Sequence, residues 1–277
     1  MTLTVFFILL FAALLHATWN AIVKAGSDKL SAAVSITGSA ALIAAVCLPF
    51  APQPALVSAP WLAVSCILQV IYTLLVAKTY QISDMGQTYP LMRGTAPLLV
   101  AGVSTFLPGE HLSLLAWAGI GVICLSILMM AMQSRGGSGK GVALALLNAC
   151  FIASYTLIDG TGVRLSESAL GYTLWTFLLN GTCMLAWGFY VRRREVARYM
   201  VRHWQKGLLG GVGTLGSYGL ALWAMTQAPL AVVAALRETS ILFGAAIAVL
   251  VLKERVSALR IAAACGIACG AILLRVA

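Results

Sequence analysis

Charged residues are scarce in this sequence. Asp, Glu, Lys and Arg make up 9% of its 277 residues, whereas 61% of the residues are hydrophobic. A water-soluble domain carries about 25% charged residues, because its surface faces water. The deficit excludes a soluble globular protein and indicates a chain that is largely surrounded by lipid.

Alternation of polar and apolar positions is also missing. The hydrophobic residues instead form continuous runs of roughly 18 to 24 residues, the length that a helix needs to cross about 30 Å of hydrocarbon. Only helices and closed barrels satisfy their backbone polar groups in lipid, and continuous runs exclude the barrel. We therefore predict an all-α integral membrane protein with ten transmembrane helices. The predicted spans are 3–24, 32–50, 61–80, 87–107, 113–133, 141–158, 169–191, 205–226, 229–252 and 257–275.

The loops between these runs are too short to hold a separate soluble domain. Residues 1–277 are therefore expected to form a single membrane domain. The first run has no basic segment before it and no obvious small-residue cleavage site. We expect it to be a retained first span and not a signal peptide.

Signatures of catalysis, nucleotide binding and metal binding are absent. The sequence contains no GxxxxGK[ST], HExxH or GxSxG motif and no clustered acidic pair. Its seven cysteines form no CxxC pair and lie in apolar runs, as small packing residues do. His16 is accompanied only by His111 and His203, which lie near loops. We expect no metal site, no cofactor and no enzymatic activity.

The positive net charge of +10 comes from 18 basic and 8 acidic residues. Much of the excess lies between Arg192 and Lys206, beside a predicted span, which is typical of cytoplasmic loops and not of a nucleic-acid-binding surface. Basic residues gather at the odd-numbered loops, whereas Arg164 and Arg275 stand alone on the other side. The distribution places the odd-numbered loops in the cytoplasm and both termini outside. We expect a multi-pass protein of a bacterial-type inner membrane.

An internal repeat divides the chain into two halves. At a constant offset of 144 residues, four polar residues of the first half match four of the second without a gap. The pairs are Arg93 with Arg237, Thr95 with Thr239, Glu110 with Glu254 and Ser113 with Ser257. The two serines each precede an apolar run and are expected to be helix N-caps in tight connecting turns.

The two repeats are predicted to cover residues 1–135 and 141–277. Five spans in each half force the second copy to enter the membrane from the opposite side. The prediction is therefore a pair of inverted repeats, which is an architecture of transporters.

Three stretches also resemble a known family. HATWNAIVK (16–24), YPLMRGTAPLL (89–99) and ALRETSILFGAAIAVLVLKERVS (235–257) are similar to the EamA-type family of the drug/metabolite transporter superfamily. This resemblance implies ten helices, secondary transport and, commonly, export of amino acids, other metabolites or toxic compounds. It does not specify the cargo.

Arg93, Arg237 and Glu238 lie well inside predicted spans, where a charge costs about 2.5–3.5 kcal/mol on insertion scales. Arg93 and Arg237 either stabilise the fold through backbone bonds and snorkelling or bind a carboxylate or phosphate of the substrate. Glu238 either bonds another helix or binds a proton or a substrate ammonium group. Adjacent residues on a helix point about 100° apart, so Arg237 and Glu238 are not expected to pair.

Three uncharged residues complete the candidate substrate site. Trp19 and Asn20 belong to a polar stripe on the first span that faces either a cavity or another helix. Tyr155 matches this region of the first span across the repeat and is a second aromatic candidate. Asp159 follows the predicted sixth span and is interpreted as a loop cap in preference to a site.

The favoured function is secondary active transport of a small molecule, with export of amino acids or related zwitterionic or amphiphilic compounds by alternating access. A proton gradient is the favoured driving force, with exchange or facilitated diffusion as alternatives. An importer of the same fold is the nearest alternative function. A non-transporting membrane sensor or assembly protein is the alternative from another class. The expected partners are the substrate, the lipid bilayer and protons, with the chain as a monomer or homodimer.

Overall fold

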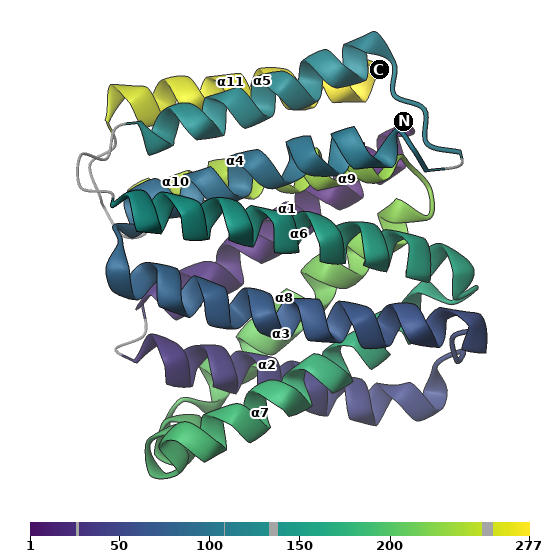
Figure 1. Ribbon diagram of the computed structural model, residues 1–277. Helices are drawn as coiled ribbons and strands as arrows, with labels where there is room; N and C mark the ends of the chain where they lie inside the picture. Colours follow the sequence, from purple (N-terminus) through teal and green to yellow (C-terminus); the bar gives the residue numbers. More distant parts are fainter. Residues whose placement is uncertain (26–27, 108, 133–137, 251–256) are drawn as a thin grey trace.

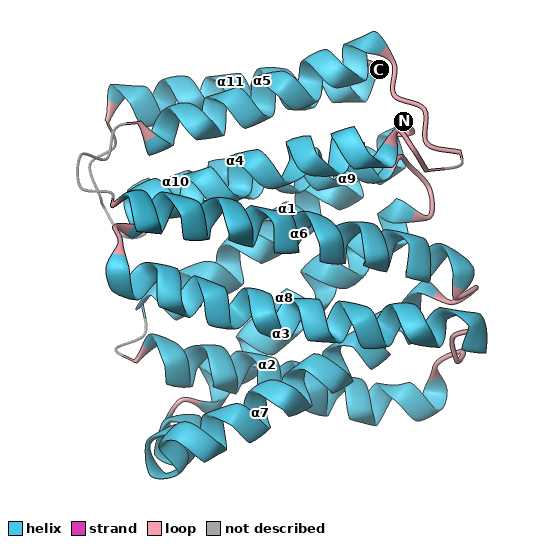
Figure 2. Cartoon of the chain, viewed as in Figure 1, coloured by secondary structure: helices cyan, strands magenta, loops and turns pink. Residues whose placement is uncertain are grey.

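The fold is described from a computed structural model, which covers residues 1–25, 28–107, 109–132, 138–250 and 257–277. Within these ranges the regular structure is helical, and no strand occurs (Figure 2). The helices are α1 (Leu3–Ala25), α2 (Lys29–Cys47), η1 (Leu48–Phe50), η2 (Leu56–Ser58), α3 (Ala59–Ile82), α4 (Met85–Ser104), α5 (Leu114–Ala131), α6 (Gly139–Leu165), α7 (Ala169–Arg202), α8 (Trp204–Met225), α9 (Leu230–Arg237), α10 (Ser240–Leu250) and α11 (Ala258–Val276).

Nine segments of the described chain are long and apolar enough to cross a membrane. They coincide with nine of the ten predicted spans, and α9 and α10 together form one of them, Leu230–Ile247. The prediction of an all-α integral membrane protein is therefore confirmed. Helix α4, the remaining predicted span, does not meet the same requirement of length and apolar composition.

The helices run back and forth between two ends of the molecule (Figure 1). The connections α2–α3, α4–α5, α6–α7 and α8–α9 lie at one end together with both termini, which we call the terminal end. Helices α1, α3, α5, α7 and α10 end at the opposite end, which we call the loop end, and α2, α4, α6, α8 and α11 begin there. The described helix ends that flank the predicted odd-numbered loops therefore lie together.

Small residues let several helices approach closely. Helix α5 crosses α11 where a Cβ atom added to Gly270 would lie 2.8 Å from the carbonyl oxygen of Gly119. Helix α2 approaches α7 at Gly181, where an added Cβ would lie 2.5 Å from the carbonyl oxygen of Thr37. Contacts this close exclude any larger residue and provide the packing that holds helices together in lipid.

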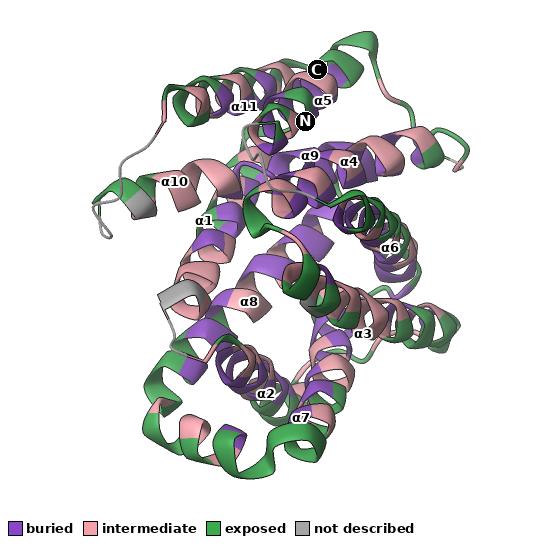
Figure 3. Ribbon diagram, turned by 60° about the vertical axis from the view of Figure 1, so that its left-hand side comes forward, coloured by how far each residue is buried: buried purple, intermediate pink, exposed green. Residues whose placement is uncertain are grey.

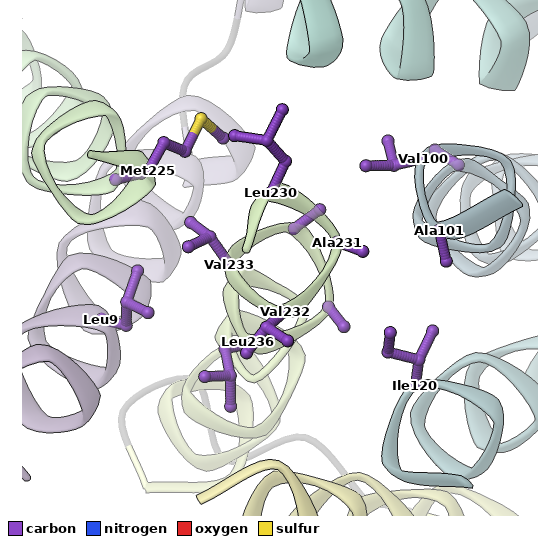
Figure 4. Packing of buried hydrophobic residues seen from close by; sticks show 14 of the residues in the cluster. Leu9, Val100, Ala101, Ile120, Met225, Leu230, Ala231, Val232, Val233 and Leu236 are labelled. Atoms are coloured by element: carbon purple, nitrogen blue, oxygen red, sulfur yellow. The ribbon is translucent and has the colours of Figure 1, made fainter. Parts of the chain in front are cut away.

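The buried core surrounds α9. Every residue from Leu230 to Leu236 is buried, so this short helix contacts protein on all sides. Figure 3 shows the buried positions concentrated on α9 and on the inner faces of its neighbours. Figure 4 shows the side chains that enclose it, which come from α1 (Leu9), α4 (Val100, Ala101), α5 (Ile120) and α8 (Met225).

Three predicted spans differ from the observed helices. The span 141–158 was ended too early, because α6 continues to Leu165. The span 229–252 is interrupted at Glu238 and Thr239, where backbone N–H groups bond to carbonyls three residues earlier. The span 169–191 continues as helix to Arg202, beyond a non-helical backbone conformation at Arg192.

The serine caps were predicted correctly. The Ser113 hydroxyl accepts a hydrogen bond from the amide of Ala116, at 3.1 Å, at the start of α5. The Ser257 hydroxyl accepts one from the amide of Arg260, at 3.4 Å, at the start of α11. Glu254, the predicted counterpart of Glu110, lies outside the described residues.

Candidate functional site

The break between α9 and α10 places two charged residues at the centre of the bundle. Arg237 ends α9, and Glu238 follows it in the turn that precedes α10. Interrupted helices of this kind line substrate sites in transporters, because the free helix ends and side chains face the interior of the protein. The sequence predicted both residues as site candidates but predicted a continuous helix through them.

Glu238 forms an ion pair with Arg93 of α4. The Nε atom of Arg93 donates to Oε2 of Glu238 at 2.8 Å, and the side chains are 10% and 6% exposed. Arg93 belongs to the first predicted repeat and Glu238 to the second, so the pair connects the two halves. The prediction had left structural and substrate-binding roles open for each residue, and the ion pair is compatible with both.

Arg237 points in a different direction. Its guanidinium carbon lies 4.9 Å from the centre of the Tyr218 ring on α8, within the range of a cation–π interaction. It therefore contacts an aromatic ring while Glu238 contacts Arg93. The expectation that Arg237 and Glu238 do not pair agrees with these partners.

A small cavity lies between α4, α6 and α9. Its volume is about 10 Å³, close to the least space that holds one water molecule. Four of the six predicted site residues line it, namely Arg93, Tyr155, Arg237 and Glu238. The remaining lining residues are Ala96, Pro97, Val100, Ile152, Thr156 and Ala234.

One nitrogen of the cavity is without a partner. The Nη2 atom of Arg93 is buried and makes no hydrogen bond to any described residue. An unpaired buried donor is costly, so a ligand or water that accepts from it would be stabilising. The ring of Tyr155 stands at 63° to that of Tyr72, with 5.6 Å between the ring centres, and this aromatic pair flanks the charged groups.

Trp19 and Asn20 are not among the residues that line this cavity. Asn20 donates from Nδ2 to the backbone carbonyl of His16 at 2.8 Å, within α1 itself. Trp19 stacks edge-on against His16 and faces Gly213 of α8. Its Nε1 atom is buried without a partner among the described residues. Contact of these two residues with substrate stays a prediction, as does proton coupling by Glu238.

A second buried carboxylate belongs to Asp159, which the sequence analysis interpreted as a loop cap. That interpretation is wrong, because Asp159 is fully buried within α6. It accepts hydrogen bonds from the Tyr172 hydroxyl at 3.0 Å, from the Tyr218 hydroxyl and from Nε2 of Gln69 at 3.1 Å. The drop in hydropathy at Asp159 and Gly160 had indicated a loop, and no local signal pointed to these partners.

A third buried carboxylate joins the helices at the terminal end. Glu110, in the connection after α4, lies 2.6 Å from Nη1 of Arg164 at the end of α6. Its Oε2 atom also accepts from the amide of Leu230 at the start of α9, at 3.0 Å. Arg164 donates in turn to the carbonyls of Met225 and Ala228. The sequence analysis did not predict this contact, although it noted Arg164 as one of the few basic residues on the side that corresponds to the terminal end.

Among the described residues, no cluster of three or more His, Cys, Asp or Glu side chains occurs that could hold a metal ion. The candidate site is therefore built from an ion pair, a second arginine and aromatic rings. Such groups recognise charged and amphiphilic organic molecules.

The second half of the chain matches a known protein family. The model of the EamA-like transporter family matches residues 139–276, about half of the sequence. A solved structure described only as a crystal structure of a protein superposes with a TM-score of 0.73 at 16% identity, over 98% of this chain and 94% of the other. At this identity the likeness shows the fold alone. A search of curated proteins finds no match.

The family assignment agrees with the expectation of a multi-pass membrane transporter and with the expectation that the chain is not an enzyme, since the family consists of transporters. It rests on the half of the chain that carries Tyr155, Arg237 and Glu238. The chain belongs to the EamA-like transporter family of the drug/metabolite transporter superfamily.

Proposed function

We propose that this protein is a secondary active transporter that exports a small zwitterionic or amphiphilic metabolite, such as an amino acid, by alternating access. The observation that carries the proposal is the buried Arg93–Glu238 ion pair, which joins α4 to the break between α9 and α10 at the central cavity. A site at the contact between two halves changes its exposure when the halves move apart on one side.

The charges of the cavity match a zwitterion. Arg93 keeps a buried donor free at Nη2, and a guanidinium binds a carboxylate through two parallel hydrogen bonds. Glu238 offers a negative charge to an ammonium group. A substrate that carries both groups replaces the internal ion pair with two of its own, so neither buried charge is left without a partner.

The small volume of the cavity indicates a closed state. About 10 Å³ cannot hold an amino acid, so substrate binding requires the helices around the cavity to separate. At the terminal end, Glu110 and Arg164 tie the α4–α5 connection to α6 and α9. We propose that this contact closes the terminal end and breaks when the transporter opens there.

Ten membrane spans in two inverted halves form part of the proposal. Helix α4 has 20 residues, about 30 Å of helix, and packs against α5, α6 and α9. A span covered by neighbouring helices needs less apolar surface, which accounts for its polar composition. The packing supports inverted repeats, because α1 packs on α8 as α3 packs on α6, and α2–α7 and α5–α11 are matched partners.

The proposed orientation places the loop end in the cytoplasm of a cell with a bacterial-type inner membrane. The described basic residues of the loop end include Lys29, Lys140 and the series from Arg192 to Lys206, whereas Arg164 and Arg275 lie near the terminal end. Basic residues remain on the cytoplasmic side during insertion. A reporter fused after Ala277 should therefore be active outside, and a cytoplasmic signal would contradict this orientation.

Counterflow in proteoliposomes tests the transport proposal. Vesicles loaded with pooled unlabelled amino acids and related zwitterions are diluted into labelled members of each pool. Wild-type protein should accumulate label from at least one pool, and the Arg93→Gln and Glu238→Gln variants should not. The direction of transport follows from imposing a substrate gradient on protein of known orientation.

The matched control is Glu195→Gln, which makes the same change at an exposed carboxylate of α7. It should transport like the wild type. If no pool is accumulated by wild-type protein, metabolite transport is contradicted. If both site variants accumulate label at the wild-type rate, the cavity is not the substrate site.

A further inference from the structure

Asp159 is a buried carboxylate that forms no ion pair with any described residue. It lies on α6 with no exposed surface, and its neighbours come from α3, α7 and α8. No described Lys, Arg or His lies within ion-pair distance of it. Glu238 and Glu110 are also buried, but each is paired with an arginine. Asp159 therefore differs from the other two buried carboxylates in having no arginine partner among the described residues.

The described residues that donate hydrogen bonds to Asp159 are neutral. Tyr172 donates to Oδ1, while Tyr218 and the Gln69 amide donate to Oδ2. The hydroxyl of Ser65 is a further hydrogen-bonding partner. Hydroxyl groups can rotate and act as acceptors, so the same shell can surround either a carboxylate or a protonated acid. This property suits a group that gains and loses a proton inside the protein.

Charged and titratable groups face Asp159 from several helices. On its own helix the nearest is Tyr155. On α4, Arg93 bonds to Glu238. The others are Cys66 on α3, Tyr172 on α7, Tyr218 on α8 and Arg237 on α9. Tyrosine and cysteine are neutral at physiological pH, so Asp159 and Arg237 carry the ionised charge of this group.

Tyr218 connects Asp159 to the substrate cavity. Its hydroxyl donates to Asp159, and the guanidinium of Arg237 lies against the same ring. A phenol that donates to a carboxylate has a more electron-rich ring, which attracts a cation more strongly. When Asp159 is protonated, this donation weakens and the ring holds Arg237 less firmly. Arg237 lines the cavity, so the proton changes a group that faces the substrate.

We propose that Asp159 binds the proton that drives transport and that Tyr218 transmits its protonation to Arg237. The proton adds to a carboxylate oxygen from one aqueous side, forms a neutral acid, and leaves to the other side. One O–H bond forms and later breaks, and no other reactant is needed. The assignment deepens the proposed function and rests on it for the substrate, but proton binding itself can be measured without one.

The first experiment measures protonation directly. Full-length protein in lipid is titrated between acidic and alkaline pH while the infrared C=O stretch of protonated carboxylic acids is recorded. The wild type should show a buried acid that titrates, and Asp159→Asn should lack it, whereas Glu238→Gln and Glu110→Gln should retain it. Loss of the signal in Glu238→Gln, with retention in Asp159→Asn, would assign the proton to Glu238 and overturn the proposal. So would the absence of any titrating acid.

Two tyrosine variants test the connection. Tyr172→Phe and Tyr218→Phe each remove one donor to the carboxylate, so both should move the titration midpoint to higher pH. Of these two tyrosines, Tyr218 is the one whose ring also contacts Arg237. Both variants retain an aromatic ring of the same shape, so they are matched controls for folding.

The second experiment compares two modes of transport. Its substrate is a pool that the wild type accumulates in counterflow. The rate of uptake driven by a pH gradient is divided by the rate of counterflow, because counterflow needs no net proton movement. This ratio should fall about tenfold in Asp159→Asn and Tyr218→Phe, a typical coupling between two sites, and fall less in Tyr172→Phe. Equal ratios in all variants, or dependence on a sodium gradient in place of protons, would overturn the proposal.

The two experiments separate the proposals from each other. If the wild type transports no pool but Asp159 titrates, the proposed substrate class fails and the proton site stands. If the wild type shows counterflow but Asp159 does not titrate, transport stands and the proton site fails.

Discussion

Glu238 and Asp159 are two buried carboxylates of the same half of the chain, and their surroundings are opposite. Glu238 bonds to the guanidinium of Arg93, whereas Asp159 is surrounded by tyrosine hydroxyls and an amide. Glu238 lies at a break between two short helices, whereas Asp159 lies inside a long continuous one. The two sites are connected through Tyr218 and Arg237.

The two environments suit two different tasks, the binding of a charged substrate and the binding of a proton. An ion pair is neutral as a unit, and a molecule with both charges can replace its internal contacts. A lone carboxylate in a neutral shell changes its charge when it binds a proton. A proton-driven transporter needs both properties. We propose that these properties belong to separate residues, whereas the sequence analysis had offered Glu238 for either one.

The largest effect is expected from Glu238→Gln. The substitution leaves the Arg93 guanidinium buried without its counter-charge, which costs about 3–5 kcal/mol. The double variant Arg93→Gln with Glu238→Gln should regain most of that loss, because neither charge remains. Reversible unfolding in mixed detergent micelles measures both. A double variant as unstable as the single one would show that Glu238 stabilises the fold through contacts other than Arg93.

Glu110→Gln is expected to destabilise the protein less. It removes the charge opposite Arg164, and an amide oxygen remains to accept from Leu230. Arg164 is one-third exposed and retains bonds to the carbonyls of Met225 and Ala228, so its charge stays solvated. We expect a loss of about 1–3 kcal/mol in the same unfolding assay. A loss as large as that of Glu238→Gln would mean that the contact at the terminal end is as fully desolvated as the central one.

Asp159→Asn should change stability less again. The amide keeps an oxygen that accepts from the tyrosine hydroxyls, and no buried cation loses its partner. We expect a change of about 1 kcal/mol or less, in either direction. Because the aspartate gains or loses a proton and the asparagine does not, their difference should vary with pH. A loss near that of Glu238→Gln would indicate a charge-paired aspartate and contradict the contrast between the two sites.

Much of the fold was predictable because hydrophobic runs are long and continuous. Ser113 and Ser257 could be recognised as caps, since capping depends on residues within one turn. The pairing of Arg93 with Glu238 was not predictable, because it joins residues 145 positions apart. Asp159 was misinterpreted for a related reason. A polar residue followed by glycine resembles a loop, and it remains helical here because other helices supply its hydrogen bonds.

A carboxylate at the loop end, whose side chain is 31% exposed, provides a third case for comparison, and its replacement is expected to have an effect of similar size. Asp28 caps α2 by accepting from the amides of Leu30 and Ser31, and Arg192 lies 4.0 Å away. Partial burial would raise the pKa of Asp28, but hydrogen bonds from Ser31 and Leu30 and the charge of Arg192 outweigh it and hold the pKa below its ordinary 3.8.

Replacement of Asp28 by Ala should cost about 1 kcal/mol, as loss of an N-cap does. A folded-state pKa below the unfolded one stabilises the protein above the unfolded value, and this contribution disappears as pH falls through the folded value. The difference between wild type and Asp28→Ala should therefore be constant near neutral pH and shrink below about pH 3.8. Parallel unfolding titrations of the two proteins measure it. A difference that persists at the lowest pH would show that Asp28 stabilises α2 by its shape and not by its charge.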